Sequence, residues 1–427
     1  MKIPTIEDHL RHSDRKEWAN QNQHICLLPY SSRQFFHSTL SASPCCNLIK
    51  KPETDFIRPI IEIKNSIMSQ QTYSDCSVCY TCEKEGKISE RTRYLIELSD
   101  HELDDFIDNQ NVGEFYVHCT LSSLCNMACR SCNINTSSLF AKIELGKNLV
   151  SETISDTQDY WDFMLHTIKT ATEEHARVNV VVSGGEGFVQ SDFEKLYNWL
   201  IDNNLSQKIN FTINTNGTIA TQPLFDKLCT NFKQISLAIS VDSIYENYHY
   251  VRWPYTWEKI STNLQTFVDI KNNYSNFNFF LTPVWSVNNI FYLKDWIEFF
   301  DQFANNNSID LVSYDTPLFQ PNWLDTQFMP TRLKQILVNE IEPLLENKWF
   351  QKSKTFHANI SNLVELYKSR DCDVGIWSLY LKKTAEWDVK TKTSLDVHNS
   401  KLYKHLGIDD IDQYKHFKLV AENRNRT

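Results

Sequence analysis

Leu124-Cys125-Asn126-Met127-Ala128-Cys129-Arg130-Ser131-Cys132-Asn133 is the stretch around which this chain is organised. Its three cysteines are separated by three and then two residues, which is too close for independent core thiols. Reduced thiolates at this density are typical ligands of iron or zinc, and a tight loop can turn all of them toward one metal centre. A structural site normally takes four protein ligands, whereas a catalytic centre keeps one position open. The triad therefore predicts a metal centre at which another molecule can bind.

The alternative interpretation of this loop is a zinc knuckle that takes a fourth ligand from Cys119 or His118. A cysteine triad by itself is only a motif hypothesis, because thiolates bind zinc as well as iron. The residues that follow the loop favour the catalytic centre.

The length and composition of the chain indicate a folded, soluble protein with more than one small core. At 427 residues, two domains or one large barrel with an extension are expected. Hydrophobic residues make up 41 % and charged residues 22 %, which is typical of globular proteins. The net charge of −10 argues against a nucleic-acid partner, because proteins that bind the phosphate backbone present surplus Lys and Arg.

The sequence also predicts a cytoplasmic location and no membrane partner. No run of about 18 apolar residues is present, and residues 1–9 lack the apolar core of a signal peptide. In a reducing compartment the 12 cysteines are expected to be thiols, and clustered thiols there indicate metal binding rather than disulfides.

From Gly113 onward, short runs rich in β-branched and aromatic residues alternate with segments of helical periodicity, such as 193–200 and 293–300. This alternation predicts a parallel α/β architecture. The expected strands are 115–119, 178–182, 209–213, 235–239, 277–281 and 309–312.

Distinctive residues follow these strands, where the chemistry of parallel barrels is found. Gly184 and Gly185 after the second strand allow a close approach of the backbone, and the carboxylate of Glu186 can accept hydrogen bonds from an ammonium group. A charge-assisted bond of that kind contributes about 1.5–3 kcal/mol. The later strand ends carry Asn214-Thr215-Asn216-Gly217, Ser240-Val241-Asp242-Ser243 and then Arg252.

The cysteine spacing and these motifs, in this order, resemble the radical S-adenosylmethionine (SAM) superfamily. The resemblance implies a partial (β/α)6 TIM-type barrel over residues 111–315. It also implies that Cys125, Cys129 and Cys132 bind a 4Fe–4S cluster whose fourth iron is chelated by SAM. Reductive cleavage of SAM would then produce a 5′-deoxyadenosyl radical that abstracts hydrogen from a substrate.

The same resemblance implies how SAM is bound. In the family the Gly-Gly-Glu motif lies beside the methionine amine, and a Ser and an Arg twelve positions apart bind the carboxylate and ribose region. The cofactor-binding residues expected on this basis are Gly184, Gly185, Glu186, Asn214, Asn216, Ser240, Asp242 and Arg252.

Residues 1–110 form a cysteine-rich region that resembles the N-terminal "twitch" module, a shortened relative of the SPASM auxiliary-cluster domain. The shared residues are a Cys-x-x-Pro-aromatic, a Pro-Cys-Cys, and a Cys-x-x-Cys followed by Glu83, Gly86, Ser89 and Arg91. The resemblance implies a second, auxiliary 4Fe–4S cluster. A zinc ribbon is the alternative, because cysteine ligands alone do not separate zinc from iron–sulfur. The expected ligands are Cys26, Cys45, Cys76 and Cys79, with Cys46 able to replace Cys45 and Cys82 able to compete.

Residues 316–427 are expected to form a mainly helical C-terminal extension with a single cysteine, Cys372, and no chemical role that the sequence reveals. The function predicted for the whole chain is a radical SAM enzyme that acts on a peptide or small-molecule substrate and receives electrons from a donor such as flavodoxin or ferredoxin. The alternative is a non-catalytic zinc or iron–sulfur binding protein. No catalytic acid or base can be named from the sequence.

Overall fold

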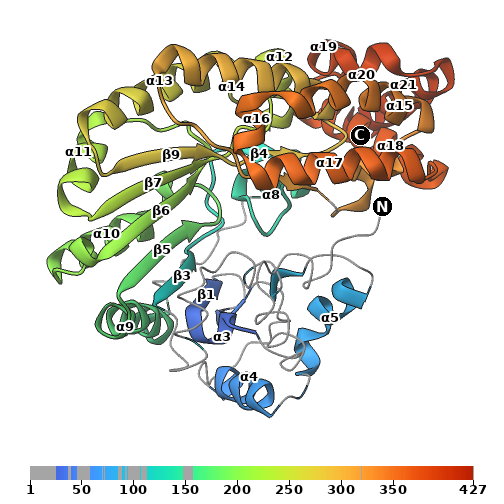
Figure 1. Ribbon diagram of the computed structural model, residues 1–427. Helices are drawn as coiled ribbons and strands as arrows, with labels where there is room; N and C mark the ends of the chain where they lie inside the picture. The colour runs from blue at the N-terminus through green and yellow to red at the C-terminus, as the bar shows by residue number, and fades with distance from the viewer. Residues whose placement is uncertain are drawn as a thin grey trace.

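A mostly parallel sheet is the central element of the computed structural model, which describes residues 26–36, 40–45, 58–69, 71, 73–84, 89–91, 94, 106, 113–147, 157–318 and 320–426. Within these residues the sheet has seven strands in the order β2-β1-β3-β5-β6-β7-β9 (Figure 1). Every neighbouring pair from β1 to β9 is parallel, and β2 pairs antiparallel with β1 at the edge. The strands are β1 (Ser32–Phe36), β2 (Ser41–Ser43), β3 (Glu114–Thr120), β5 (Arg177–Ser183), β6 (Ile209–Thr215), β7 (Gln234–Ile239) and β9 (Phe277–Leu281).

One face of the sheet is covered by the helices that connect its strands (Figure 1). Alternate residues of each strand point to that face, as Phe211 and Ile213 of β6 do, and both are fully buried. The ring of Phe211 stacks between Phe193 and Phe232, with centroid distances of 5.9 and 4.8 Å. The covering helices are α9 (Gln158–Glu174), α10 (Ser191–Asp202), α11 (Gln222–Asn231), α13 (Trp257–Asn273) and α14 (Leu293–Asn307).

The predicted parallel α/β architecture and five of the predicted strands are confirmed, but the sixth strand is not. Residues 309–312 form no strand, and a single parallel bridge joins Leu281 to Ser313. The contact with β9 consists of two backbone hydrogen bonds, from the Leu281 amide to the Val312 carbonyl (3.1 Å) and from the Tyr314 amide to the Leu281 carbonyl (2.8 Å), because the segment meets β9 only at its last residue. A short parallel pair, β10 (Val284–Trp285) with β11 (Thr316–Pro317), follows at this edge.

The sheet also extends beyond the predicted barrel. Strand β1, which belongs to the region expected to be a separate cysteine-rich module, pairs in parallel with β3 from Ser32 opposite Tyr116 to Phe36 opposite Thr120. The sheet therefore crosses the boundary expected at residue 110. The remaining described elements of this region are the helices α3 (Leu28–Ser31), α4 (Arg58–Met68) and α5 (Ser77–Lys84) and the short 3-10 helix η1 (Ser74–Cys76).

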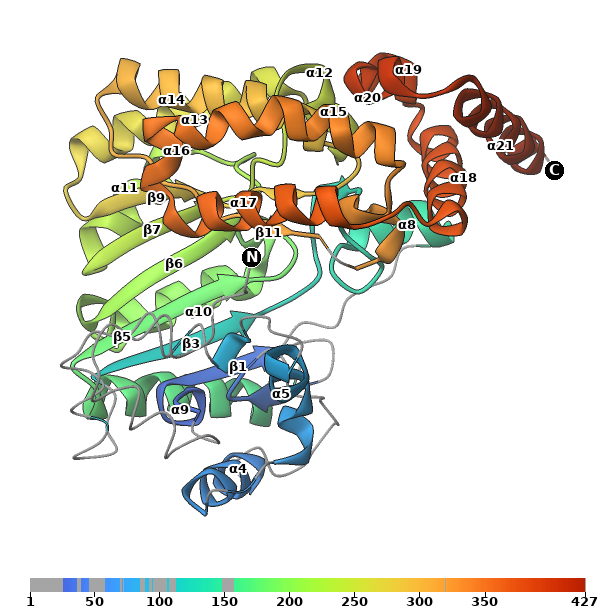
Figure 2. The same cartoon turned by 45° about the vertical axis from the view of Figure 1, so that its right-hand side comes forward.

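The C-terminal region is helical, as predicted. Helix α15 packs on α17, and α18 packs along α21 (Figure 2). Trp349 of α16 donates its indole N–H to the Leu311 carbonyl (2.9 Å), which fixes these helices to the open edge of the sheet. The helices are α15 (Thr331–Ile341), α16 (Lys348–Lys352), α17 (Lys354–Ser369), α18 (Val374–Thr391), α19 (Leu395–His398), α20 (Ser400–His405) and α21 (Ile408–Arg426). No helix in the described part of the chain is long and apolar enough to cross a membrane.

Asp315 lies in the contact between this sheet edge and α17. Its Oδ1 accepts a hydrogen bond from Asn359 (2.9 Å), and its buried Oδ2 has no partner. Burial raises the pKa of this carboxyl from 3.8 to about 7. Because the unfolded chain loses the proton at lower pH than the folded one, the free energy of unfolding falls as the pH rises from about 4 to about 7.

We therefore expect Asp315→Asn to stabilise the protein relative to the parent by roughly 2 kcal/mol more at pH 8 than at pH 5. Urea unfolding at the two pH values measures this difference. Asp310→Asn is the matched control, because the Asp310 side chain is 80 % exposed, and its effect should be the same at both pH values. An equal effect of Asp315→Asn at both pH values would show that its carboxyl is ionised in the fold.

Candidate cluster and cofactor site

The cysteine loop lies at the carboxyl end of β3 and is held there by a short antiparallel pair. Strand β4 (Ala128–Cys129) pairs with β8 (Arg252–Trp253), so that Cys129 lies opposite Arg252. The Arg130 amide continues this contact by donating to the Val251 carbonyl (2.9 Å). Helix α8 (Ser138–Leu145) follows the loop, and α12 (Tyr245–Val251) leads into β8. The pairing brings two of the sequence-predicted regions together.

The three thiols of the loop are neighbours whose charges influence one another. Burial, together with the nearby Cys129, raises the pKa of Cys125 to about 12. A hydrogen bond between the Cys129 and Cys132 thiols raises the pKa of Cys129 and lowers that of Cys132. The positive charge of Arg252 favours the thiolate at all three positions.

The cysteine loop does not form a site for a single metal ion in this structure. In the described part of the chain, no three His, Cys, Asp or Glu side chains converge closely enough to hold one metal ion. The ligands of a cluster bind different irons and do not need to converge on one point. The donor set of three cysteines on one loop therefore fits a cluster better than an isolated ion.

The Gly-Gly-Glu segment after β5 lies directly against the cysteine loop. Gly184 and Gly185 have φ values of +84° and +55°, and a Cβ on Gly185 would collide with the Leu124 carbonyl oxygen. The Glu186 amide donates to that same oxygen (2.9 Å). The close approach that the glycines permit is thus to the backbone that precedes Cys125.

Gln190 strengthens this junction and was not singled out by the sequence. Its side-chain Nε2 donates to the carbonyl oxygens of Gly184 (2.8 Å), Leu124 (3.1 Å) and Ser122 (3.3 Å). One buried amide group therefore joins the end of β5 to the start of the loop. A glutamine four residues after a Gly-Gly-Glu motif carries no signal by itself, because two of its three partners are backbone atoms 66 and 68 residues away.

Glu186 is fully buried beneath the loop. Its Oε1 accepts from the Thr215 hydroxyl (2.9 Å) and the Phe188 amide (3.3 Å), and its Oε2 accepts from the Asn216 amide (2.6 Å). Burial raises the pKa of Glu186 to about 7, although these hydrogen bonds and the charge of Arg252 oppose the shift.

The two asparagines predicted after β6 take different positions. Asn216 is buried and donates to Asn126 of the cysteine loop (2.7 Å). Asn126 in turn donates to Thr218 (2.9 Å) and Tyr255 (3.0 Å). Asn214 lies on the face of β6 opposite to Phe211 and Ile213, where it is exposed. The structure therefore brings Asn216 to the loop and leaves Asn214 away from it.

Ser240, Asp242 and Arg252 gather at the ends of β7 and β8. Asp242 accepts from the Nε of Arg252 (2.9 Å) and from the Val284 amide (2.9 Å), so both its oxygens are used. Arg252 and Asp242 are both almost fully buried. The hydroxyl of Ser240 contacts that of Thr282 (3.4 Å) and is only partly buried.

The C-terminal extension supports the cysteine loop, which the sequence did not reveal. Arg130 forms a buried ion pair with Asp388 of α18, and its guanidinium lies 3.6 Å from the centroid of the Tyr250 ring. Asp388 also accepts from Thr393 (2.9 Å) and Tyr414 (2.7 Å). The ion pair joins residues 258 positions apart, which is why no local pattern predicts it.

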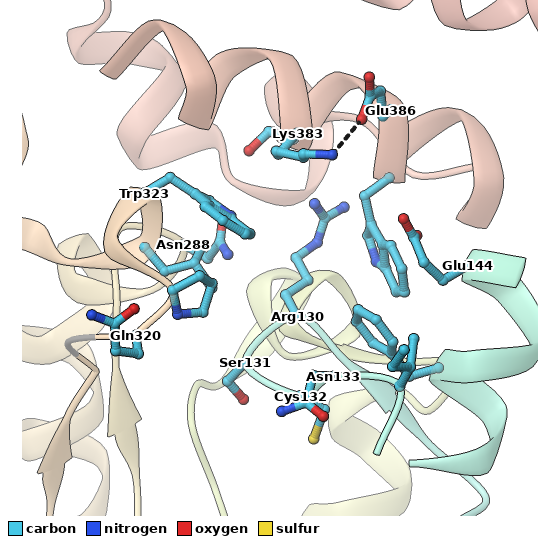
Figure 3. Close-up of a pocket in the computed structure, with 16 residues that line it drawn as sticks. Arg130, Ser131, Cys132, Asn133, Glu144, Asn288, Gln320, Trp323, Lys383 and Glu386 are labelled. Atoms are coloured by element: carbon cyan, nitrogen blue, oxygen red, sulfur yellow. Dashed lines mark hydrogen bonds and ion pairs between the residues drawn. The ribbon is translucent and has the colours of Figure 1, made fainter. Parts of the chain in front are cut away.

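A cavity of about 450 Å³ lies between this loop and α18 (Figure 3). Arg130 reaches into it from the loop, and Lys383 and Glu386, which pair at 3.2 Å, face it from α18. Trp323 and Asn288 form another wall. Cys132 also lines the cavity, so one predicted cluster ligand borders it.

The four predicted auxiliary ligands lie around a second cavity. Cys26, Cys45, Cys76 and Cys79 all line one small cavity, together with Arg91. Arg91 forms an ion pair with Glu83, whose Oε1 also accepts from the Ser89 hydroxyl. Burial raises the pKa of the Cys26 thiol, and the nearby Cys45 and Cys76 raise it further. Cys46, Gly86 and the side chain of Cys82 lie outside the described residues.

We expect Gly185→Ala to displace the cysteine loop, because the added Cβ meets the Leu124 carbonyl and the left-handed backbone is strained. The loss in the free energy of unfolding should be about 3 kcal/mol or more. Gly146→Ala is the matched control, since Gly146 has a φ of +66° with nothing within 4 Å of the added Cβ. It should lose only about 1 kcal/mol. Equal losses in chemical denaturation would show that the contact with Leu124 does not constrain the loop.

Comparison with known proteins agrees with this geometry. Residues 119–298 match the family model of the radical SAM superfamily. No curated protein matches the chain. Among solved structures, native anSMEcpe with bound AdoMet has 16 % identity and a TM-score of 0.38, with 54 % of this chain and 60 % of that chain covered. Native anSMEcpe with bound AdoMet and Cp18Cys peptide has 15 % identity and a TM-score of 0.33, with 67 % and 61 % covered.

The chain spans about 60 % of the length of the solved structures that it matches. The segment matched by the family model contains the cysteine loop, the Gly-Gly-Glu junction and the Asp242–Arg252 pair. A SAM-binding 4Fe–4S cluster and SAM are what this family implies at that site. The chain therefore contains a segment over residues 119–298 that matches the radical SAM superfamily, and its reaction is unassigned.

Proposed function

We propose that this enzyme abstracts a hydrogen atom from a peptide or small-molecule substrate. Cys125, Cys129 and Cys132 would hold the SAM-binding 4Fe–4S cluster. When bound, the cluster and SAM together supply the 5′-deoxyadenosyl radical that removes the hydrogen. The observation that carries the proposal is the arrangement of three thiols on one loop, beside the buried carboxyl group of Glu186 and the buried guanidinium group of Arg252.

The charges around the loop match those of an amino-acid group. Glu186 can pair with an ammonium group, and Arg252 can pair with a carboxylate. Both side chains act on the electrostatics of Cys125, so all three lie within one small region. Their burial removes competing water, which strengthens each interaction. We propose that five further residues position the side chains of Glu186 and Arg252: Gly184, Gly185, Asn216, Ser240 and Asp242. For Asn214 we propose a contact on the open face of the sheet.

We place the substrate in the cavity between the cysteine loop and α18. Its volume of about 450 Å³ is in the range of ligand pockets. Trp323 offers an apolar surface, Asn288 offers a carboxamide, and the Lys383–Glu386 pair offers both signs of charge. This combination suits a peptide segment, whose amide groups need donors and acceptors and whose side chains need apolar contact.

We also propose that Cys26, Cys45, Cys76 and Cys79 hold an auxiliary 4Fe–4S cluster. Because all four line one cavity, a common ligand suits the chemistry of their thiols, and the Glu83–Arg91 ion pair involves α5, which carries Cys79 and directly follows Cys76. A structural zinc ion is the competing occupant. An external donor such as flavodoxin or ferredoxin would supply the electron that the reaction needs.

Iron analysis with and without the loop cysteines tests the proposal. The protein is purified without oxygen, reconstituted with iron and sulfide, and assayed with reductant and SAM for 5′-deoxyadenosine. We expect about eight irons in the parent and about four in the Cys125→Ala/Cys129→Ala/Cys132→Ala variant, with 5′-deoxyadenosine from the parent alone. Cys229→Ala is the control, because Cys229 lies on α11, apart from both cysteine groups.

The other outcomes separate the parts of the proposal. About four irons in the parent, all lost in the triple variant, would retain the enzyme and remove the auxiliary cluster. Zinc in place of iron, without cleavage of SAM, would identify a non-catalytic metal-binding protein and contradict the proposed function.

A further inference from the structure

The hydroxyl of Tyr248 has no hydrogen-bond partner although it is completely buried. The side chain is 0 % exposed, and no acceptor or donor lies within bonding distance of its oxygen. Buried polar groups in proteins are almost always hydrogen-bonded, because burial removes their hydrogen bonds to water and a partner in the protein must replace them. An isolated hydroxyl at such a position indicates that its partner is absent from the polypeptide itself.

Tyr248 lies in the layer of the cysteine loop. It lies on α12, and its carbonyl accepts a hydrogen bond from the Arg252 amide where the helix ends. Arg252 in turn lies opposite Cys129 in the β4–β8 pair. The ring of Tyr248 packs against Trp257 at a centroid distance of 5.9 Å, so its position is fixed from behind.

The electrostatics of the phenol place it among the charged groups of the site. Burial raises the pKa of Tyr248, and the positive charge of Arg252 opposes the shift. The nearby Cys129, Asp242 and Glu186 add to the rise. The phenol therefore stays protonated, and its O–H group can donate a hydrogen bond.

Two of its charged neighbours already have their own donors. Asp242 accepts from Arg252 and the Val284 amide, and Glu186 accepts from three groups of the chain. The sulfur of Cys129 is different, because its thiol loses its proton when it binds iron and then becomes a strong acceptor. The acceptor that appears only with the cluster is therefore this sulfur.

We propose that Tyr248 donates a hydrogen bond to the Cys129 sulfur of the bound cluster and thereby raises the cluster's reduction potential; this inference rests on the proposed function. Reduction adds negative charge to the cluster, and a donor at a ligand sulfur stabilises that charge. Tyr248 is a positioning and tuning residue, because it acts through Cys129.

Tyr248→Phe tests the inference, with Tyr367→Phe as the matched control. Tyr367 of α17 is also a buried tyrosine, but its hydroxyl lies near Thr326, outside this site. In the protein without iron, Tyr248→Phe should not lower the midpoint of thermal unfolding, since no bond is lost. In the reconstituted protein it should move the midpoint potential to more negative values and release iron to a chelator about tenfold faster. Tyr367→Phe should match the parent in both measurements.

Three results would overturn the inference. A potential and an iron-release rate equal to those of the parent would show that the phenol does not bind the cluster sulfur. A loss of stability in the iron-free variant would show that the hydroxyl already has a partner in the chain. An unchanged potential with weaker SAM binding in equilibrium dialysis would assign the phenol to SAM instead. A parent without any redox-active cluster would contradict the proposed function and the inference together, whereas the first three results leave the proposed function intact.

Discussion

The close contact between the Gly-Gly-Glu turn and the backbone before Cys125 is the constraint on which the site depends. It requires a residue without a side chain at Gly185, and it is fixed by the Glu186 amide and the Gln190 side chain, both of which donate to the Leu124 carbonyl. The contact fixes the position of the cysteine loop relative to the end of β5. It also brings the buried Glu186 near enough to Cys125 to raise the pKa of that thiol.

Two further contacts complete the support of the loop. The β4–β8 pair joins Cys129 to Arg252, and the Arg130–Asp388 ion pair joins the loop to α18. The loop is thus held by the sheet, by the segment that carries the cation, and by the C-terminal extension. Because a buried charge without its partner costs about 3–5 kcal/mol, the extension is part of the architecture of the site.

The sequence predicted the features that depend on local pattern. The strand positions followed from apolar runs, and the order of motifs at the strand ends identified Glu186, Asn216 and Arg252, which the structure brings to the cysteine loop. The sixth strand was wrong, because an apolar run does not reveal that this segment meets β9 only at its last residue, Leu281. Gln190 and Asp388 were missed for a similar reason: their partners are distant in sequence, and single polar residues carry no periodicity. Tyr248 becomes visible only when its hydroxyl can be checked against its surroundings.

The central claim is that Cys125, Cys129 and Cys132 hold a cluster with one iron open to SAM. Mössbauer spectroscopy of ⁵⁷Fe in a variant without Cys26, Cys45, Cys76 and Cys79 tests it most directly. We predict one 4Fe–4S cluster in which a single iron changes its isomer shift when SAM is added. Four irons that do not respond to SAM, or a protein that binds no cluster while it retains its fold, would contradict the account.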